Sequence, residues 1–472
     1  MKKLLALVLA AMMLLVSVAA LAEGEESLYP EKVEGIDFGG KTIYVYDYWT
    51  ASADRVAEPT EEQQAQYDYR DWINETYNCN IIQIAKGDWG SNVTELLNFT
   101  TAPDGTLCLY ILPPDFVGTP MANGVLAAWN GEGSLVDFAD KQWNSATVDF
   151  MTVNGSIYGV STGNSEPRQC LYFNKRVLEE AGIDWNTEVY DAQANGTWTF
   201  EVFENLLKRI NKDTDNDGVL DIYGMTGSNV DMYRVAVFAN GGSFFDFDEN
   251  GKLVITAGSD NTLEALAWAK DTWNTYGYQQ PADGSWDYYK DAWKQGFCGF
   301  YMYQTYGGFN DNSEMADMAD EWGCVAFPIG PKGDKYVNIV SDNVTVIPNV
   351  YDAKTVNDLV YIYKLFSATT PGYDDEDAWI GNKYNFTDER AVDETYAMLR
   401  QPEHCASDKV LYLGSVNDIE GADYLWNLGG GTPAELLEAK TPVWQALIDT
   451  LDRKSTRLNS SHIGSSRMPS SA

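Results

Sequence analysis

The acidic segment KDTDNDGVLDIYG, from Lys212 to Gly224, has the residue types and the spacing of a cation-binding loop. In a calcium loop, oxygen ligands come from positions 1, 3, 5, 7 and 9, and position 6 is a glycine that allows a sharp turn. Gly218 falls on that glycine position. The ligand positions are then filled by Asp213, Asp215, Asp217, the backbone carbonyl of Val219, and Asp221. Because carboxylate oxygens at alternating positions can surround one hard cation, the spacing predicts a structural Ca²⁺ site.

The calcium motif is incomplete at its last position. Position 12 is normally a glutamate that binds the ion through both carboxylate oxygens, and here it is Gly224. The alternative is a solvated turn in which the aspartates bond to the backbone without a metal. No histidine and no evident nucleophile stands beside the loop. A cation there would stabilise a connection and would not polarise a substrate.

Histidine and closely spaced cysteine, the residues of many catalytic and zinc sites, are scarce. The two histidines are His404 and His462. Two histidines so far apart in the sequence give little basis for a catalytic triad or a multi-histidine zinc site. The six cysteines include no CxxC pair. Three of them, Cys170, Cys298 and Cys324, stand in apolar strand-like runs, where we expect buried free thiols. Export would permit a disulfide, but the sequence does not pair the cysteines.

The whole chain is acidic. Its 472 residues contain 70 Asp and Glu against 32 Lys and Arg, which gives a formal net charge of −38 at pH 7. Nucleic-acid binding needs a basic surface, so this composition argues against it. The long-range field favours neutral or cationic ligands over anionic ones. The length and a hydrophobic content of 44% predict two domains with a sizeable core.

The first 22 residues have the pattern of an export signal. Two lysines precede an apolar run from Leu4 to Ala19, and the sequence ALA at residues 20–22 fits small-x-small cleavage. The alternative is a retained anchor helix, because the run is nearly long enough to span a bilayer. The first cysteine is Cys79, so a lipid anchor is not expected. We predict an exported, extracellular or periplasmic protein that is not a lipoprotein.

The end of the chain, residues 454–472, differs sharply in composition from the rest. It is rich in serine, has no acidic residue and contains three basic ones. It resembles adapter or vector sequence, so we expect it to be non-native and disordered.

Strand-like and helix-like segments alternate along the chain. Segments rich in Ile, Val and Tyr predict strands at 41–49, 79–85 and 107–112, and residues 63–77 predict a helix. This alternation indicates βαβ units and a largely parallel sheet. Residues 170–183 predict a strand that runs into a helix, and Thr199 is a plausible N-cap of another helix. Further strands are expected at 153–163, 296–308, 321–331 and 343–349, and further helices at 263–273 and 352–368.

Seven segments, taken in order, resemble family 1 extracellular solute-binding proteins, the maltose-binding-protein-like capture subunits of carbohydrate-type ABC importers. They are NGSIYGV, LYFNKRVLEEAGI, TWTFEVFENLLKRI, the acidic loop, FANGG, WKQGFCGFYMYQTYGG and VAFPIGP. The resemblance implies an α/β, type II periplasmic-binding-protein fold of two lobes. Each lobe is expected to be a mostly parallel sheet flanked by helices, with the ligand in the cleft between them. Relatives in single-membrane bacteria are usually lipid-anchored, so the missing cysteine leaves the retention of this protein open.

The resemblance also implies where the chain passes between the lobes. We expect the first crossing near Tyr158–Gly163 and the return near Val325–Gly330. Lobe one then contains residues 28–157 and 327–366, and lobe two contains residues 158–326 and 367–451.

The expected ligand contacts lie at or near the carboxyl ends of strands, where open α/β sheets bind ligands. Aromatic side chains suit the faces of sugar rings, while carboxylates, amides and arginines suit the hydroxyls. Ordinary packing is the alternative for each residue. Trp49 and Tyr306 are the first choices. The full set is Asp47, Trp49, Asp115, Phe116, Glu166, Arg168, Asn229, Asp231, Tyr233, Gln304, Tyr306 and Trp426.

We therefore expect a monomeric solute-binding protein that captures a sugar or oligosaccharide and delivers it to ABC importer permease subunits. It would be no enzyme, and it would need no cofactor apart from the structural Ca²⁺. One alternative is a binder of a cationic solute, a polyamine or a peptide, which the net charge favours slightly. A second is a secreted glycosidase with a carboxylate pair, although no spacing in the sequence nominates such a pair.

Overall fold

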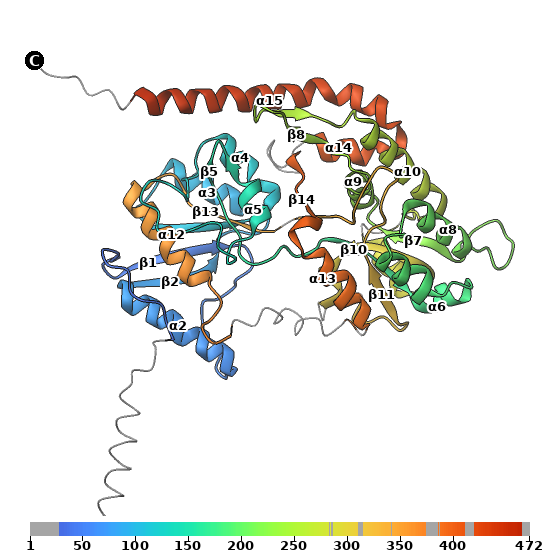
Figure 1. Cartoon of the computed structure of the whole chain (residues 1–472), viewed down its shortest axis with the longest axis horizontal. Coiled ribbons are helices and arrows are strands. Elements are labelled where there is room, and N and C mark those ends of the chain that lie inside the picture. Colours follow the sequence, from blue (N-terminus) through green and yellow to red (C-terminus); the bar gives the residue numbers. More distant parts are fainter. Residues whose placement is uncertain are drawn as a thin grey trace, which may run out of the picture.

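The computed structural model describes residues 28–282, 284, 287–309, 315–340, 342–373, 386, 388–410 and 420–464. Side chains are described for these residues except 306, 309, 420–423 and 451–464. Two α/β lobes lie next to each other, and each is built on a four-stranded sheet (Figure 1). The predicted export signal at residues 1–22 lies outside the described part of the chain.

The sheet of the first lobe has the strand order β13-β3-β1-β2. β1 (Lys41–Asp47) is parallel to β2 (Cys79–Ala85) and to β3 (Leu107–Leu112), while β13 (Val344–Val346) is antiparallel to β3. Helices α2 (Glu61–Tyr77) and α12 (Ala353–Ser367) pack on one face of the sheet, and α3 (Asn92–Thr101) packs on the other. The strands and helices predicted for this region are confirmed.

The sheet of the second lobe has the order β11-β6-β10-β7. It contains β6 (Gln169–Asn174), β7 (Tyr223–Gly227), β10 (Cys298–Gln304) and β11 (Trp322–Val325). β10 is parallel to β7, but β10 and β11 are both antiparallel to β6. This sheet is therefore mixed, whereas we expected a mostly parallel one. β6 receives the chain from the first lobe and runs against both of its neighbours, a direction that local sequence does not encode.

The helices of the second lobe begin and end where local signals place them. The side chain of Thr199 accepts a hydrogen bond from the Val202 N–H at 3.4 Å and caps α8 (Phe200–Ile210), as predicted. The apolar stripe of α8 is buried under β7. Further helices are α6 (Lys175–Glu180), α9 (Asn229–Ala239), α10 (Asp260–Tyr276), α11 (Tyr288–Lys294) and α14 (Glu420–Asn427). Shorter elements are α4 (Gly118–Ala122), α5 (Ser145–Phe150), α7 (Ala192–Ala194), α13 (Ala397–Leu399), and the hairpins β4 (Thr152–Val153) with β5 (Ser156–Ile157) and β8 (Phe245–Phe247) with β9 (Leu253–Ile255).

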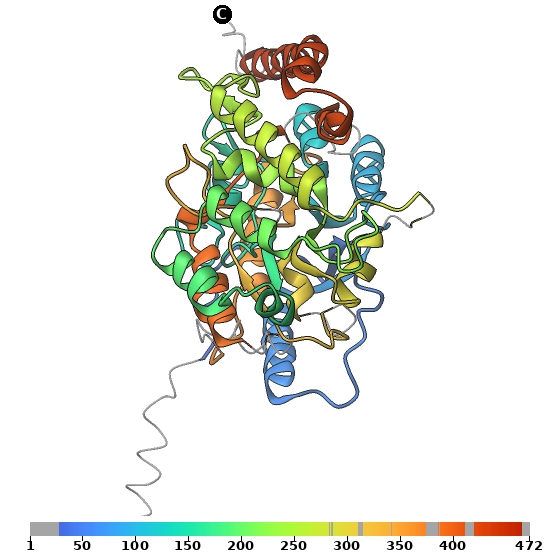
Figure 2. The same ribbon diagram turned by 90° about the vertical axis from the view of Figure 1, so that its right-hand side faces the viewer.

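A long C-terminal helix, α15 (Pro433–Gly464), lies along the top of the molecule in both views (Figures 1 and 2). It contacts α4 of the first lobe and β9 and α10 of the second. Trp444 of α15 is buried, with its ring 5.2 Å from that of Phe245. The helix continues to Gly464, so part of the segment that we expected to be disordered has helical backbone.

The segment before the return to the first lobe packs on the second sheet. The Ile329 N–H donates to the Trp198 carbonyl at 3.0 Å, and β12 (Asn338–Ile339) pairs with β14 (Cys405–Ala406). Val344 then pairs with Leu112 of the first sheet. These contacts favour a return after Val340, later than the Val325–Gly330 that we expected. We therefore assign residues 327–340 to the second lobe.

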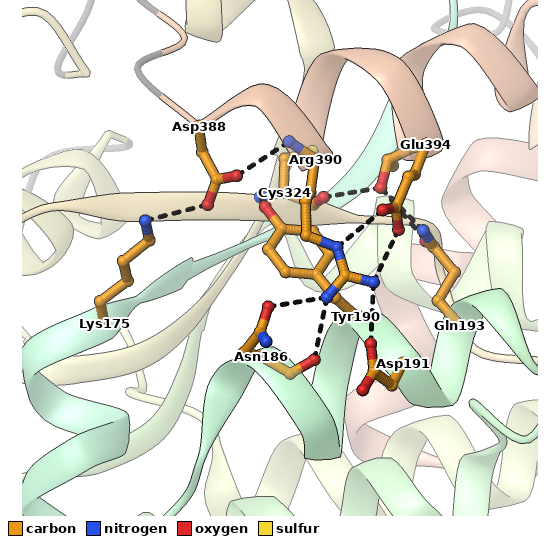
Figure 3. Close-up of polar contacts among 10 residues, drawn as sticks. Lys175, Asn186, Tyr190, Asp191, Gln193, Cys324, Asp388, Arg390 and Glu394 are labelled. Carbon is orange, nitrogen blue, oxygen red and sulfur yellow. Dashed lines mark hydrogen bonds and ion pairs between the residues drawn. The ribbon is translucent and has the colours of Figure 1, made fainter.

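After α12 of the first lobe, Phe386 and the residues from Asp388 onward pack in the second lobe, and a charged network holds the chain at Asp388 (Figure 3). Lys175 Nζ lies 2.9 Å from a carboxylate oxygen of Asp388, and the two side chains are 13% and 7% exposed. The Lys175 ammonium also lies 4.3 Å from the centre of the Trp185 ring. The other carboxylate oxygen of Asp388, Oδ1, accepts a hydrogen bond at 3.0 Å from the backbone N–H of Arg390.

Arg390 joins two π-helical turns, η2 (Asn186–Asp191) and η5 (Ala391–Tyr396) (Figure 3). Its guanidinium donates to Glu394 at 2.7 and 2.9 Å, to the Asn186 side chain at 2.7 Å, and pairs with Asp191 at 3.0 Å. It also lies 4.8 Å from the centre of the Tyr190 ring. The chain that follows Asp388 is thereby fixed to the edge of the second sheet.

All six cysteines are free thiols, and Cys170, Cys298 and Cys324 are buried as predicted. Within the described residues, no helix combines the length and the apolar character that a membrane crossing requires.

Candidate functional site

The loop after β1 is held by Asp47 and exposes Trp49. The buried Asp47 carboxylate accepts hydrogen bonds from the Trp49 and Thr50 N–H groups at 3.2 and 3.0 Å, from the Thr50 hydroxyl, and from Gln83 Nε2 at 2.8 Å. Four donors fill the acceptor sites of a carboxylate, so Asp47 shapes the loop and leaves no oxygen free for a ligand. Trp49 is 50% exposed and packs edge-on against Tyr48, with ring centres 4.7 Å apart.

Tyr48 links this loop to the return connection. Its hydroxyl donates to Asn343 Oδ1 at 2.8 Å. Burial raises the pKa of Tyr48, with Arg168 opposing and Asp115 adding to this shift, so both charges lie near the phenol. Sequence patterns did not indicate Tyr48, although it occupies the same strand end that pointed to Trp49.

The loop after β3 carries Asp115 and Phe116. Phe116 is buried, and its ring centre lies 4.7 Å from that of Trp89, which is 42% exposed. Phe116 therefore supports an exposed aromatic side chain and is itself covered. Trp89 follows β2, and the strand-end rule that selected Trp49 would also have selected it.

Asp115 lies at the centre of a mixed cluster of charges from both lobes. Burial raises the pKa of its carboxyl group, Arg234 and Arg168 lower it, and Asp231 and Asp408 raise it further. Asp115 comes from the first lobe and the other four residues from the second. Among the described residues, no side-chain hydrogen bond is formed by the Asp115 carboxylate.

Two predicted residues of this region, Arg168 and Gln304, meet directly. Arg168 Nη1 donates to Gln304 Oε1 at 3.3 Å, at the end of β10. Arg234 was not predicted, although it lies three residues after Asp231 on α9. Arg234 Nε lies 3.7 Å from Asp408 Oδ2, and the side chains of these two residues are 18% and 5% exposed. The local sequence around Asp408 gives no sign of this contact, which forms only in the folded chain.

The remaining predicted contacts are more scattered. Asn229 and Asp231 are half-buried in the first turn of α9, whereas Tyr233 is 1% exposed and packs in the core, where burial raises its pKa. Trp426 on α14 is 48% exposed. The backbone of Tyr306 begins a turn after β10, but its side chain lies outside the described part of the structure.

Glu166 belongs to the connection between the lobes. It forms an ion pair with Arg400, and its N–H donates to Asp342 Oδ1 at 3.1 Å. Burial raises the pKa of Asp342. A cavity of about 250 Å³ lies beside these residues and is lined by residues 138–146 of the first lobe except 142, by 163–165, and by Arg400, Pro402 and Cys405. Its walls come from both lobes and from the first crossing, so it is a hinge cavity.

The acidic loop brings three of its four aspartates together. Carboxylate oxygens of Asp213, Asp215 and Asp221 lie within 4.8 Å of one another, and in the described residues this group includes neither Asp217 nor a glutamate. Gly218 has a φ of +91°, the left-handed conformation that its position requires. Three carboxylates fit a Ca²⁺ ion, with backbone and water oxygens completing its shell.

The packing of α8 explains the glycine at the end of the motif. A β-carbon on Gly224 would lie 3.1 Å from Leu207 atoms, which is closer than ordinary contact. The Gly224 N–H donates to Asn211 Oδ1 at 2.6 Å, so this backbone is already bound to the end of the helix. A side chain at position 224 would therefore force Leu207 to shift, which disfavours a glutamate there.

Comparison with known proteins identifies the fold and the family. Residues 82–360, more than half of the chain, match the model of a family described as bacterial extracellular solute-binding protein. A search of curated proteins finds no match. The cyclic alpha-maltosyl-1,6-maltose binding protein of Arthrobacter globiformis is 17% identical with a TM-score of 0.59, over 87% of this chain and 99% of that one.

Two further solved structures are similar over the same extent. The GacH receptor of Streptomyces glaucescens, solved unliganded and with acarbose, is 14% identical with a TM-score of 0.58, over 86% of this chain and 99% of that one. UgpB of Mycobacterium tuberculosis, in complex with glycerophosphocholine, is 14% identical with a TM-score of 0.56, over 87% and 99%. These similarities show a two-lobed type II periplasmic-binding-protein fold. The chain belongs to the family of bacterial extracellular solute-binding proteins, the exported binding components of ABC transporters.

Proposed function

We propose that this protein captures a neutral sugar or oligosaccharide and delivers it to the permease subunits of an ABC importer. The observation that carries the proposal is the cluster of charges between the lobes. Three aspartates, Asp115, Asp231 and Asp408, stand with two arginines, Arg168 and Arg234. The formal charge of this cluster is −1, although that of the whole chain is −38. A site with intermixed donors and acceptors suits hydroxyl groups, each of which both donates and accepts.

Exposed aromatic side chains stand at neighbouring strand ends. Trp49 and Trp89 follow the adjacent parallel strands β1 and β2 and are 50% and 42% exposed. Large aromatic rings normally gain from burial, and a ring left half in water offers a flat apolar surface for a sugar ring. The ligands of the GacH receptor and of the Arthrobacter protein agree with this chemistry.

The alternative ligand is a cationic solute. The net charge of −38 would draw a polyamine or a basic peptide toward the protein. UgpB shows that proteins of this fold also bind glycerophosphocholine. Against a cation stand the two arginines, Arg168 and Arg234, because each would repel a positive group within the cluster.

Titration calorimetry separates these ligands. We expect heat of binding with at least one of maltotriose, xylotriose and mannotriose, and none with spermidine. Heat with spermidine alone would exclude the sugar proposal. We also infer that the protein breaks no glycosidic bond, so incubation with polysaccharides should release no reducing sugar. Light scattering after gel filtration should give the mass of a monomer.

Two further features are part of the proposal. We propose that the export signal is removed after Ala22, and mass spectrometry of the exported protein would give its N-terminus. We also propose a structural Ca²⁺ ion in the acidic loop, because Asp213, Asp215 and Asp221 present oxygens within 4.8 Å of one another.

A further inference from the structure

Arg234 is a mostly buried arginine, and its Nε–H has no hydrogen-bond acceptor among the described residues. Its side chain is 18% exposed, and its nearest acid, Asp408, lies 3.7 Å from Nε, too far for a good hydrogen bond. The buried Nε has no hydrogen-bond partner, and no hydrogen bond joins the guanidinium to any described residue. Nε–H is one of the five N–H donors of a guanidinium, and leaving a buried donor without an acceptor is unfavourable. Such a group is expected where a ligand supplies the missing acceptors.

Arg234 belongs to a part of the second lobe that lies near the first lobe. Asp408 is the acidic partner of Arg234, and Lys409 follows it in the sequence. The Lys409 ammonium lies 5.9 Å from the ring centre of Phe150, which belongs to the first lobe. Asp115 of the first lobe is within electrostatic reach of Arg234 but is not in ion-pair contact with it. Asp115 also makes no side-chain hydrogen bond in the described part of the chain, so an unused acceptor of one lobe lies within electrostatic reach of the Arg234 guanidinium of the other.

We propose that Arg234 is a further ligand-binding residue, and that with Asp115 of the opposite lobe it binds two adjacent hydroxyl groups of a neutral sugar. A hydroxyl can donate its hydrogen to the Asp115 carboxylate while its oxygen accepts from the guanidinium. The planar fork of Arg234 fits two neighbouring oxygens at once, which an ammonium group does not. A single sugar ring then bonds to both lobes and favours their closed arrangement.

A neutral ligand fits this pair better than an ionic one. A uronate carboxylate would approach Arg234 but would also face Asp115 and Asp408, and an amino sugar would face two arginines. Since a neutral diol supplies both a donor and an acceptor, it leaves the charges of the cluster unchanged. This inference rests on the proposed function. Its test therefore compares variants with the wild type, so that the inference can be contradicted while sugar binding by the wild type still supports the function.

The test uses Arg234→Lys, Asp115→Asn and a control, Arg209→Lys. Arg234→Lys keeps the positive charge beside the buried Asp408 and removes only the fork, so folding is preserved. Arg209 lies on α8 of the same lobe, where it pairs with Glu188 away from the charge cluster. Binding of maltotriose, xylotriose and mannotriose is measured by calorimetry, and the melting temperature of each variant is measured without sugar.

We expect Arg234→Lys and Asp115→Asn each to bind the best sugar about tenfold to a hundredfold more weakly than the wild type, and Arg209→Lys to bind normally. Without sugar, Arg234→Lys should melt within roughly 2 °C of the wild type, and Asp115→Asn should melt at or above it because an unpaired buried charge is removed. Normal sugar affinity of Arg234→Lys would overturn the inference and leave the proposed function intact. If no sugar binds the wild type, both the proposed function and the proposed binding of adjacent hydroxyl groups by Arg234 and Asp115 are contradicted. A lower melting temperature of Asp115→Asn would overturn the pair as a ligand site and make it a structural contact.

Discussion

Replacing Lys175 with methionine should destabilise the second lobe strongly. Asp388 is 8% exposed, and the lysine ammonium 2.9 Å away is its compensating charge (Figure 3). Removing one partner of a buried ion pair typically costs about 3–5 kcal/mol, because the other charge stays buried. Asp388 keeps the N–H of Arg390 at 3.0 Å, so we place the loss in free energy of unfolding at the lower end, about 3 kcal/mol. Methionine keeps an unbranched apolar side chain of similar length, but it removes the ammonium that lies 4.3 Å from the centre of the Trp185 ring.

The assay is urea denaturation, with the transition of the second lobe followed by tryptophan fluorescence. For a lobe of this size, about 3 kcal/mol corresponds to a fall in melting temperature of roughly 6–12 °C. The double variant Lys175→Met with Asp388→Asn should recover most of the loss, because no buried charge is then left alone. A matched control is Lys294→Met, whose ion pair with Asp317 is exposed and should contribute less than about 1 kcal/mol. Equal losses for Lys175→Met and Lys294→Met would refute the reasoning.

Four further outcomes are expected. Chelation of Ca²⁺ with EGTA should lower the melting temperature, because a site at a hundredfold excess of Ca²⁺ over its dissociation constant contributes about 2.7 kcal/mol to stability. Sugar affinity at 20–25 °C should be unchanged. An unchanged melting temperature would show that the acidic loop is a turn without a metal. Asp115→Asn should raise stability at neutral pH, and melting from pH 4 to 8 should show the gain shrinking toward acid pH. Burial raises the pKa of Asp115 above its ordinary 3.8, so the wild type loses stability as the pH rises through that raised pKa; a pH-independent difference would contradict this sign. Trp49→Ala should weaken sugar binding about tenfold with an unchanged melting temperature, since the ring is 50% exposed; equal affinity would exclude Trp49 from the site. Gly224→Glu should lower the melting temperature, because its side chain meets Leu207 at 3.1 Å; a stable variant would show that the loop can accept a glutamate there.

Elements with a local signal could be predicted from the sequence. β1 and β3 were visible as runs of β-branched and aromatic residues, and the start of α8 as a threonine before an apolar stripe. The direction of β6 relative to its neighbours and the late return after Val340 depend on which segments pair in the folded chain. No local pattern records that choice.

The candidate site shows the same limit. Asp47 and Asp115 are both acids at the end of a first-lobe strand, and nothing in the sequence separates their expected roles. In the structure, four donors from its own lobe saturate Asp47, while no side chain or backbone N–H of the described residues donates to the Asp115 carboxylate. Arg234 was missed because its importance comes from Asp115 and Asp408, which are distant in sequence. Residue type and position at a strand end identify candidate residues. The hydrogen bonds that each side chain already makes within the protein then distinguish a structural residue from a ligand-binding one.

The distribution of the cysteines gives the protein a natural attachment point for a reporter dye. Of the six thiols, five are buried, and Cys405 is partly accessible on the wall of the hinge cavity. Desolvation raises the pKa of this thiol, so coupling to a maleimide fluorophore should proceed faster at mildly alkaline pH. Both lobes contribute to that cavity, and a rotation of one against the other changes the surroundings of the dye. The fluorescence of the labelled native chain would then follow lobe closure directly, with no engineered cysteine.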